Sequence, residues 1–178
     1  MRRVSVVGVS GAGKTTVART LAARLSVPHI ELDAIYHQPG WAALPAAEFK
    51  ARIAGLAADE AWVIDGNYSS TVQRLVWART DTVIWLDPPR RSVMPRIIWR
   101  TIRRIVLRQE LWNGNRERLR NLLSWDPEQS VISWAWHHYP VYRQRYTAAA
   151  ADPQFAHLTF IRIADPTALR QLLNTAHR

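Results

Sequence analysis

Cysteine is absent from this chain of 178 residues, and lysine is nearly absent. Without cysteine there are no disulfide bonds, and a zinc site built on cysteine ligands is excluded. The only lysines are Lys14 and Lys50, although Lys and Arg together number 24. Arginine therefore supplies almost all of the positive charge. Because lysine is so rare here, a lysine at a fixed position of a motif supports that motif more strongly than it would in an average chain.

Long apolar runs are also missing. No stretch of about 18 uncharged apolar residues occurs, which argues against a membrane-spanning helix. The first strand pattern begins at residue 3, which leaves no room for a signal peptide. We therefore expect a soluble, cytoplasmic protein that does not bind membranes. The length predicts a single domain over residues 1–178 with excursions at about 34–46 and 108–127.

The excess positive charge is concentrated in one stretch. The net charge is +10, and ten arginines fall between residues 90 and 120 against only Glu110 and Glu117. Such a stretch fits a surface that clamps polyphosphate or a patch that binds nucleic acid. A third reading is a chain that uses arginine on every solvated helix face. The ten are Arg90, Arg91, Arg96, Arg100, Arg103, Arg104, Arg108, Arg116, Arg118 and Arg120.

The strongest motif lies at residues 3–16. A β-branched run at residues 4–7 predicts a strand, and the Ala- and Leu-rich segment from Lys14 predicts a helix. Between them, residues 8–15 match the phosphate-loop pattern G-x-x-x-x-G-K-[ST] at all four fixed positions. Glycines let the loop turn its N–H groups around a phosphate, and the helix N-terminus adds further donors. The alternative is a tight strand-to-helix turn without a ligand.

This loop predicts binding of ATP with Mg²⁺. Lys14 would reach the β- and γ-phosphates, and Thr15 would offer its hydroxyl to Mg²⁺. The loop residues expected at ATP are Gly8, Ser10, Gly11, Ala12, Gly13, Lys14, Thr15 and Thr16.

Two carboxylates close the second predicted strand, at residues 28–33. Their spacing of two places Glu31 and Asp33 on one face of the strand. In a parallel sheet this end lies at the same edge as the phosphate loop. Such a pair can hold a Mg²⁺-bound water and accept a proton from an attacking hydroxyl. The alternative is a helix N-cap at Asp33 with Glu31 in solvent.

Another acid ends the hydrophobic run at residues 61–65. A buried strand that ends in Asp65 is typical of phosphate-loop proteins, where the carboxylate orders the Mg²⁺ shell. The alternative is a turn residue before Gly66. The irregular aromatic segment 34–44, with Tyr36 and Trp41, lies where a loop that binds the acceptor would be.

The second half of the chain adds strands near residues 82–87 and 157–163 and three helices. A basic helix from residue 90 has an apolar stripe, and we expect that stripe to be buried. Pro95 and Pro140 predict a break or kink in this helix and in the helix at 128–151. A turn at Asn113-Gly114-Asn115 predicts a mobile, Arg-bearing lid. The apolar stripe is Met94, Ile98, Ile102 and Ile105, beside an arginine stripe of Arg96, Arg100, Arg104 and Arg108.

Together these motifs resemble one family. The likeness is carried by residues 8–15, 32–33, 64–68 and 110–116 and covers essentially the whole chain. They are similar to the adenylate-kinase-related nucleoside and nucleotide kinases, in particular to a bacterial group labelled adenylate kinase-like P-loop NTPase or DNA topology modulation protein. The resemblance implies an α/β, three-layer P-loop NTPase fold. Its five-stranded parallel sheet would be ordered 2-3-1-4-5, with helices on both faces, ATP and Mg²⁺ as cofactors, and a short Arg-rich lid.

Two departures from the family concern the acceptor. Adenylate kinases carry an Arg just past the second strand's loop and a Phe-Pro-Arg after the Asp-Gly, and both grip the acceptor's phosphate. The matching stretches here, residues 34–38 and 67–69, contain no arginine, which argues against AMP. Glu31-x-Asp33 is instead similar to the Asp-x-Asp of shikimate- and gluconate-type kinases, whose second acid contacts the acceptor hydroxyl.

The resemblance also implies roles for single residues. Arg100, Arg104 and Arg116 would match the family's phosphate-clamping arginines, as would Arg143 and Arg145 after the lid, with Arg143 at ATP. The expected catalytic residues are Lys14, Asp33, Arg100, Arg104 and Arg116. The expected acceptor site is Glu31, Asp33, Tyr36, Trp41, Asn67 and Tyr68, and the expected Mg²⁺ residues are Thr15 and Asp65.

The sequence thus predicts an ATP-dependent small-molecule kinase, like a nucleoside monophosphate kinase, that transfers the γ-phosphate to a nucleotide or a hydroxyl-bearing metabolite. A different class remains open, a nucleotide-regulated protein that binds nucleic acid through residues 90–120. A third reading is a nucleotide-binding module that has lost phosphoryl transfer, and the intact Lys14, Thr15 and Asp65 argue against it.

Overall fold

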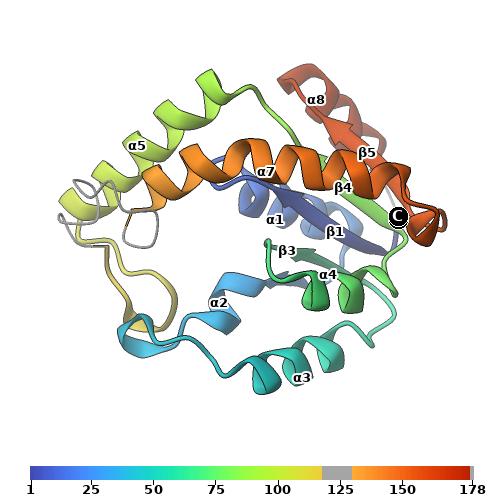
Figure 1. Cartoon of the computed structure of the whole chain (residues 1–178), viewed down its shortest axis with the longest axis horizontal. Helices are drawn as coiled ribbons and strands as arrows, with labels where there is room; N and C mark the ends of the chain where they lie inside the picture. The colour runs from blue at the N-terminus through green and yellow to red at the C-terminus, as the bar shows by residue number, and fades with distance from the viewer. Residues whose placement is uncertain (118–129, 177–178) are drawn as a thin grey trace.

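A parallel sheet forms the centre of the protein (Figure 1). The structure, a computed structural model, describes residues 1–117 and 130–176. In this part of the chain the five strands are ordered β2-β3-β1-β4-β5, so the predicted order is confirmed. The strands are β1 (Arg3–Gly8), β2 (His29–Glu31), β3 (Trp62–Asp65), β4 (Thr82–Leu86) and β5 (Thr159–Ile163).

Helices connect the strands and cover both faces of the sheet. They are α1 (Lys14–Leu25), α2 (Leu32–Tyr36), α3 (Ala46–Leu56), α4 (Ser70–Trp77), α5 (Arg90–Val106), α7 (Val131–Ala151) and α8 (Pro166–Thr175). Three short 3₁₀ turns are η1 (Pro39–Trp41), η2 (Trp112–Gly114) and η3 (Pro153–Phe155). None of the described helices is long and apolar enough to cross a membrane.

The sheet separates two hydrophobic cores. Neighbouring residues of a strand point to opposite faces, so Val6 belongs to one core and Val7 to the other. Helices α1 and α8 close the first core, and α3 and α4 close the second. Helix α7 contributes to both, with Ala135 in the first and Tyr146 in the second. Because both faces are covered, the strands read as nearly continuous apolar runs.

Helix α5 buries a different face from the one expected. Val93, Ile97 and Thr101 are buried, whereas Ile98 is 40% exposed and Trp99 is 68% exposed. The prediction that Ile98 lies in a buried stripe was therefore wrong. The helix carries apolar residues on two sides, and hydrophobicity alone does not say which side packs. The side with Ile97 packs because it rests on the phosphate loop, where a Cβ added to Gly11 would lie 2.2 Å from Ile97 Cγ1.

Helix α7 runs without a break through Pro140, so the predicted interruption was wrong. A proline has no N–H to donate to the carbonyl four residues earlier, which here belongs to Trp136. The guanidinium of Arg90 donates a hydrogen bond to that carbonyl instead. The same guanidinium lies 3.8 Å from the centroid of the Trp136 ring. Helix α5 likewise contains Pro95 in its interior. The predicted start of α7, at residues 128–129, lies outside the described residues.

Candidate active site

The phosphate loop joins β1 to α1 and has its backbone pressed against neighbouring elements. Gly8 has φ 143°, and a Cβ there would lie 2.4 Å from the carbonyl oxygen of Leu86 on β4. Gly11 has φ 81° and meets Ile97 on α5. A side chain at either position would displace backbone or a packed helix. The glycines therefore allow a close approach as well as a left-handed turn.

The first turn of α1 offers uncapped donors. Its N-cap residue is Gly13, in the left-handed region, and among the described residues no side-chain hydrogen bond caps the N–H groups of the turn. These groups and the positive end of the helix dipole suit an anion such as a phosphate. The Lys14 ammonium donates to the carbonyl of Val9 over 3.3 Å, across the same loop. Burial lowers the pKa of Lys14, while the carboxylates of Asp33 and Asp65 oppose that shift.

Three oxygen-bearing side chains converge beside the loop. The Thr15 hydroxyl lies 3.3 Å from Glu31 Oε1 and 3.4 Å from Asp65 Oδ1. The register of β2 and β3 pairs Glu31 with Asp65, which explains why the two carboxylates meet. His29 Nε2 lies 2.8 Å from Asp65 Oδ2 and holds that buried carboxylate in place. Burial raises the pKa of Glu31, and the neighbouring Trp112 side chain opposes this shift.

This donor set fits Mg²⁺ bound together with a nucleotide. Mg²⁺ prefers oxygen ligands and commonly takes one or two from the protein and the rest from phosphates and water. Thr15, Asp65 and Glu31 supply such oxygens. Among the described residues, no group of three or more His, Cys, Asp or Glu side chains is arranged to hold a metal ion by itself. The residues thus suit an ion that arrives with ATP.

Asp33 lies in the first turn of α2, because β2 ends at Glu31, two residues earlier than expected. It does not cap the helix, since the N-cap residue is Glu31. Its Oδ1 accepts a hydrogen bond of 2.7 Å from the Tyr68 hydroxyl. The Tyr68 ring packs against Tyr36 and Phe49, with centroids 5.1 Å and 4.8 Å away. Asp33 is therefore held by a residue of the segment after β3, whose ring packs on Tyr36 in the segment after β2.

Two arginines of α5 face the site. Arg100 Nη2 lies 3.3 Å from the Ser10 hydroxyl of the phosphate loop. Its Nε is buried and has no hydrogen-bond partner among the described residues. Burial, with repulsion from Arg104 second, lowers the pKa of Arg100. Arg104 is ion-paired with Glu117 at 3.0 Å. An unpartnered, buried guanidinium nitrogen beside the phosphate loop fits a phosphate oxygen.

The segment after α5 folds back onto the segment after α2 (Figure 1). Asn115 is buried, donates to the carbonyl of Gln38 over 2.9 Å, and accepts from the backbone N–H of Trp41 over 2.8 Å. Asn113 donates to the carbonyls of Ala34 and His37. The predicted lid turn is therefore docked on segment 34–44, and asparagine amides make most of the hydrogen bonds between the two.

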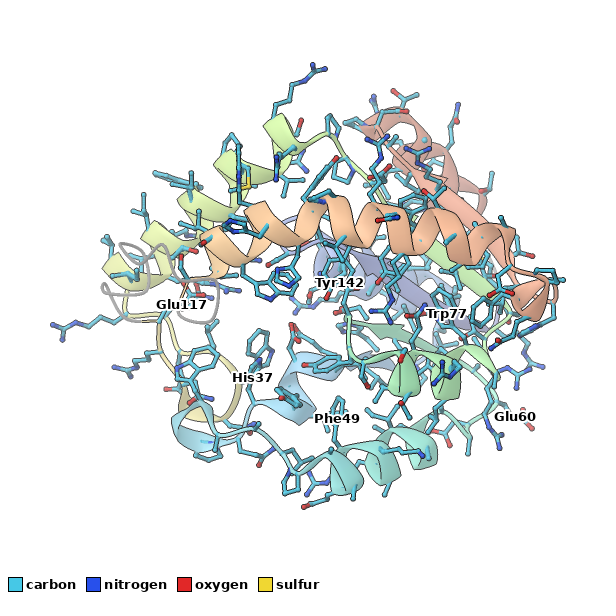
Figure 2. The ribbon with its side chains drawn as sticks, viewed as in Figure 1. His37, Phe49, Glu60, Trp77, Glu117 and Tyr142 are labelled. Carbon is cyan, nitrogen blue, oxygen red and sulfur yellow. The ribbon has the colours of Figure 1, made fainter. Side chains whose placement is uncertain are left out.

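These elements enclose a cleft of ≈ 1340 Å³. The phosphate loop, α1 and α5 form one side of it, and residues 31–41 with 109–117 form the other. Figure 2 shows His37 and Tyr142 pointing toward the same space, from the end of α2 and from α7. Among the predicted site residues that line the cleft are Ser10, Gly11, Gly13, Lys14, Thr15, Thr16, Glu31, Asp33, Trp41, Arg100 and Arg104.

Other predicted site residues make their contacts elsewhere. Asn67 pairs with the backbone of Gly8 and accepts from the Tyr146 hydroxyl, so it supports the phosphate loop. Arg116 lies 3.7 Å from Glu110 at the surface. Arg143 pairs with Asp87, which is also bound by Arg162. Asn67, Arg116 and Arg143 are not among the residues that line the cleft. Arg118, Arg120 and the rest of the predicted excursion at 118–127 lie outside the described residues.

The predicted site residues include neither Trp112, whose place in a loop already allowed stacking on a base or sugar, nor Trp134. The Trp112 side chain lowers the pKa of the neighbouring Glu31 carboxyl, and its ring stacks on His37 with centroids 5.6 Å apart. Trp134 enters from α7. The only sequence signal for them was a tryptophan in a loop and an aromatic residue every fourth position along α7, at Trp134, His138, Tyr142 and Tyr146.

Comparison with known proteins identifies the fold, but it shows no closer relationship to any family. No protein-family model matches the chain, and no curated protein matches it in sequence. Three solved structures are similar over 98% of the chain. A sugar kinase from a Janibacter species, solved without ligand, has a TM-score of 0.51 at 19% identity, with 93% of its own chain covered.

The other two similar structures are also small-molecule kinases by name. A shikimate kinase from Acinetobacter baumannii in complex with shikimate has a TM-score of 0.54 at 21% identity, with 89% of its chain covered. A gluconokinase from Sinorhizobium meliloti has a TM-score of 0.52 at 19% identity, also with 89% covered. At such identities the likeness establishes the fold, which is that of the P-loop kinases. It does not single out the adenylate kinase or DNA topology modulation groups.

Proposed function

We propose that the protein is a Mg²⁺- and ATP-dependent phosphotransferase that moves the γ-phosphoryl group of ATP to a hydroxyl of a small acceptor. The observation that carries the proposal is the placement of Lys14 and Asp33 in one cleft. Among the charged groups that act on the lysine, Asp33 exerts the strongest attraction. A phosphate-loop lysine and a carboxylate that share a cleft supply the donor and acceptor ends of a kinase site.

The residues at the donor end would hold the nucleotide's phosphates. The loop amides and Lys14 would bind the β- and γ-phosphates, and Arg100 would neutralise charge on the transferred group. Thr15, Asp65 and Glu31 would hold Mg²⁺ and its water ligands. Mg²⁺, when bound, would neutralise charge on the phosphate oxygens.

Asp33 would act at the acceptor end as the base. The acceptor oxygen forms a bond to the γ-phosphorus, and the bond from that phosphorus to the β–γ bridging oxygen breaks. Asp33 takes the hydroxyl proton, and ADP leaves with the bridging oxygen and its electron pair. Tyr68 would hold the carboxylate toward the acceptor throughout.

The nucleic-acid alternative is less favoured by the geometry. Arg100 and Arg104, in the middle of the Arg-rich stretch, lie partly buried in the cleft and contact Ser10 and Glu117. They are therefore not available to an outer surface that would follow a nucleic-acid backbone. None of the three similar structures is named as a nucleic-acid-binding protein.

The chain's two lysines provide a matched test. Lys14→Ala removes the loop ammonium, whereas Lys50→Ala removes an exposed ammonium on α3. We expect Lys14→Ala to lower Mg²⁺-dependent ADP formation from ATP by at least about 100-fold, the range for loss of one electrostatic contact to a transition state. Lys50→Ala should behave like the wild type. A Lys14→Ala protein with full ATP turnover would overturn the proposed function.

A further inference from the structure

Aromatic rings wall the acceptor end of the cleft. His37 and Trp112 are stacked, with an interplanar angle of 19°, and Trp41 meets both rings edge-on. Trp134 lines the same cleft from α7, where its ring stacks on His138. Aromatic faces bind the flat, apolar faces of rings such as sugars or bases. The wall therefore suits a ring-shaped acceptor.

The rings and the carboxylates form one surface. The Trp112 side chain lies close enough to Glu31 to lower the pKa of that carboxyl, and Asp33 is held by Tyr68. The field of Asp33 reaches both His37, which lines the cleft, and Tyr142 on α7 (Figure 2). Carboxylate oxygens accept hydrogen bonds from hydroxyl groups. A hydroxylated ring would thus place its face on the aromatic wall and its hydroxyls on Glu31 and Asp33.

The arginines near this end are already neutralised or occupied. Arg104 pairs with Glu117 at 3.0 Å, and Arg116 lies 3.7 Å from Glu110. Arg145 donates to the carbonyl of Tyr68 and to Gln73. Each of these three guanidinium groups is thus bound to another group of the protein. Among the described residues, no further arginine lies beside the aromatic wall.

The other positive groups that line the cleft, among the residues that the structure describes, belong to the donor end. Arg100 contacts Ser10, and Lys14 bridges the phosphate loop. Arg19 and Arg96 line the cleft from α1 and α5, on the same side as the phosphate loop. Burial lowers the pKa of His37, so its ring is neutral at neutral pH. At this end, an acceptor with a carboxylate or phosphate would meet two carboxylates and, among residues 1–117 and 130–176, no free cation.

We propose that the acceptor is an uncharged ring compound that carries hydroxyl groups, such as a free sugar or a nucleoside, and not a sugar acid or a nucleotide. The inference rests on the proposed function, because it names the substrate class of the same site. It also separates this protein from the similar structures named for shikimate and gluconate, both of which are acids.

Matched pairs of compounds test this substrate class on the wild-type protein. Each pair shares a ring and differs in one anionic group: a nucleoside with its 5′-monophosphate, and a hexose with its uronic acid. Acceptor-stimulated ADP formation and thermal stabilisation are measured with ATP or a non-hydrolysable analogue and Mg²⁺. We expect at least one neutral member to act, and to exceed its anionic partner by at least about 10-fold in kcat/KM. The hexose and nucleoside arms distinguish the two sources of the ring.

Variants of the aromatic wall supply a second readout. Trp112→Ala should raise KM for the neutral acceptor by about 10- to 100-fold, which is the range for loss of one stacking contact, with KM for ATP unchanged. Trp112→Phe keeps a ring and should retain most of the affinity. Trp99→Ala removes an exposed tryptophan on the outer face of α5 and serves as the matched control.

The outcomes separate the inference from the proposed function. Lys14-dependent transfer to the anionic member of a pair, or to no neutral ring in the panel, would overturn the substrate class and leave the kinase assignment standing. ATP turnover that does not depend on Lys14 would overturn both. An unchanged acceptor KM in Trp112→Ala would also count against the aromatic wall as the binding surface.

Discussion

The Tyr68 hydroxyl donates a hydrogen bond of 2.7 Å to Asp33 and so ties the segment after β3 to the segment after β2. Burial, followed by the field of Asp33, raises the pKa of Tyr68 far above its usual value. Tyr68 therefore stays protonated across the working pH range and remains a donor. A permanent donor to one oxygen of a carboxylate leaves the other oxygen to face a substrate.

Replacing Tyr68 by Phe should impair turnover more than binding of ATP. The variant keeps the ring that packs on Phe49 but loses the hydrogen bond that orients Asp33. We expect kcat to fall by about 10-fold, in line with a lost charged hydrogen bond, while KM for ATP stays within about 2-fold. Tyr36→Phe is the control, because Tyr36 lies on the same ring cluster and makes no hydrogen bond to Asp33 among the described residues. Equal losses in the two variants would show that the hydrogen bond from Tyr68 to Asp33 has no special role in turnover.

Asp33→Asn tests the proposed base directly. Asparagine keeps the size and accepts a hydrogen bond from Tyr68, but it cannot take a proton from the acceptor. We expect kcat to fall by about 10²- to 10⁴-fold, the usual contribution of a general base, with a small change in KM for ATP. Steady-state kinetics at saturating Mg²⁺ measures both. If ATP affinity and turnover fell together, Asp33 would belong to the donor end.

Glu31→Gln should stabilise the protein while it weakens catalysis. Burial raises the pKa of Glu31 above 4.5, so the folded state holds this proton more tightly than the unfolded state. Stability from this group is therefore complete below pH 4.5 and is lost as pH rises through the raised pKa. The gain in unfolding temperature of Glu31→Gln over the wild type should grow from pH 4.5 toward pH 8, without Mg²⁺ or ATP.

The matched control is Glu48→Gln, at an exposed i, i+4 ion pair with Arg52. Such a pair contributes little, so this variant should show no gain that grows with pH. A Glu31→Gln protein that loses stability at pH 8 would indicate that the contacts of the Glu31 carboxylate with Thr15 and Trp112 outweigh the cost of burying the charge.

Much of the fold was predictable because it depends on local patterns. The buried runs that end in Glu31 and Asp65, together with the loop at residues 8–15, indicate parallel strands and a shared edge. The sheet order was predicted correctly, although it came from resemblance to a family and not from spacing. The meeting of Thr15, Glu31 and Asp65 follows from that order and from the strand register.

The remaining features depend on contacts that no local pattern records. Asn67 reaches Gly8 across 59 positions of sequence, and Asn115 reaches Gln38 across 77. An asparagine is common in turns and can equally form a long-range contact. The neighbouring residues therefore do not predict the hydrogen-bond partner of its side chain. The buried side of α5 was mispredicted for a similar reason, because Ile97 packs on a glycine whose missing side chain leaves no hydrophobic signal.

Arg90 and Pro140 give a stability prediction outside the cleft. Pro140 leaves the carbonyl of Trp136 without its helical partner, and Arg90 donates to that carbonyl and covers the Trp136 ring. Arg90→Ala should cost about 1 kcal/mol, from one hydrogen bond and one exposed cation–π contact. For a chain of this size, that corresponds to a fall of about 2–4 °C in the unfolding midpoint.

A double-mutant cycle separates the two contacts of Arg90. Pro140→Ala restores an N–H that can donate to the Trp136 carbonyl, so in that background Arg90→Ala should lose only the ring contact and cost about half as much. Pro140→Ala alone should not destabilise α7, because alanine favours the helix interior. Thermal unfolding of the four proteins measures the coupling. If Arg90→Ala costs the same in both backgrounds, then the guanidinium does not compensate for the proline, and the ring contact alone accounts for its effect.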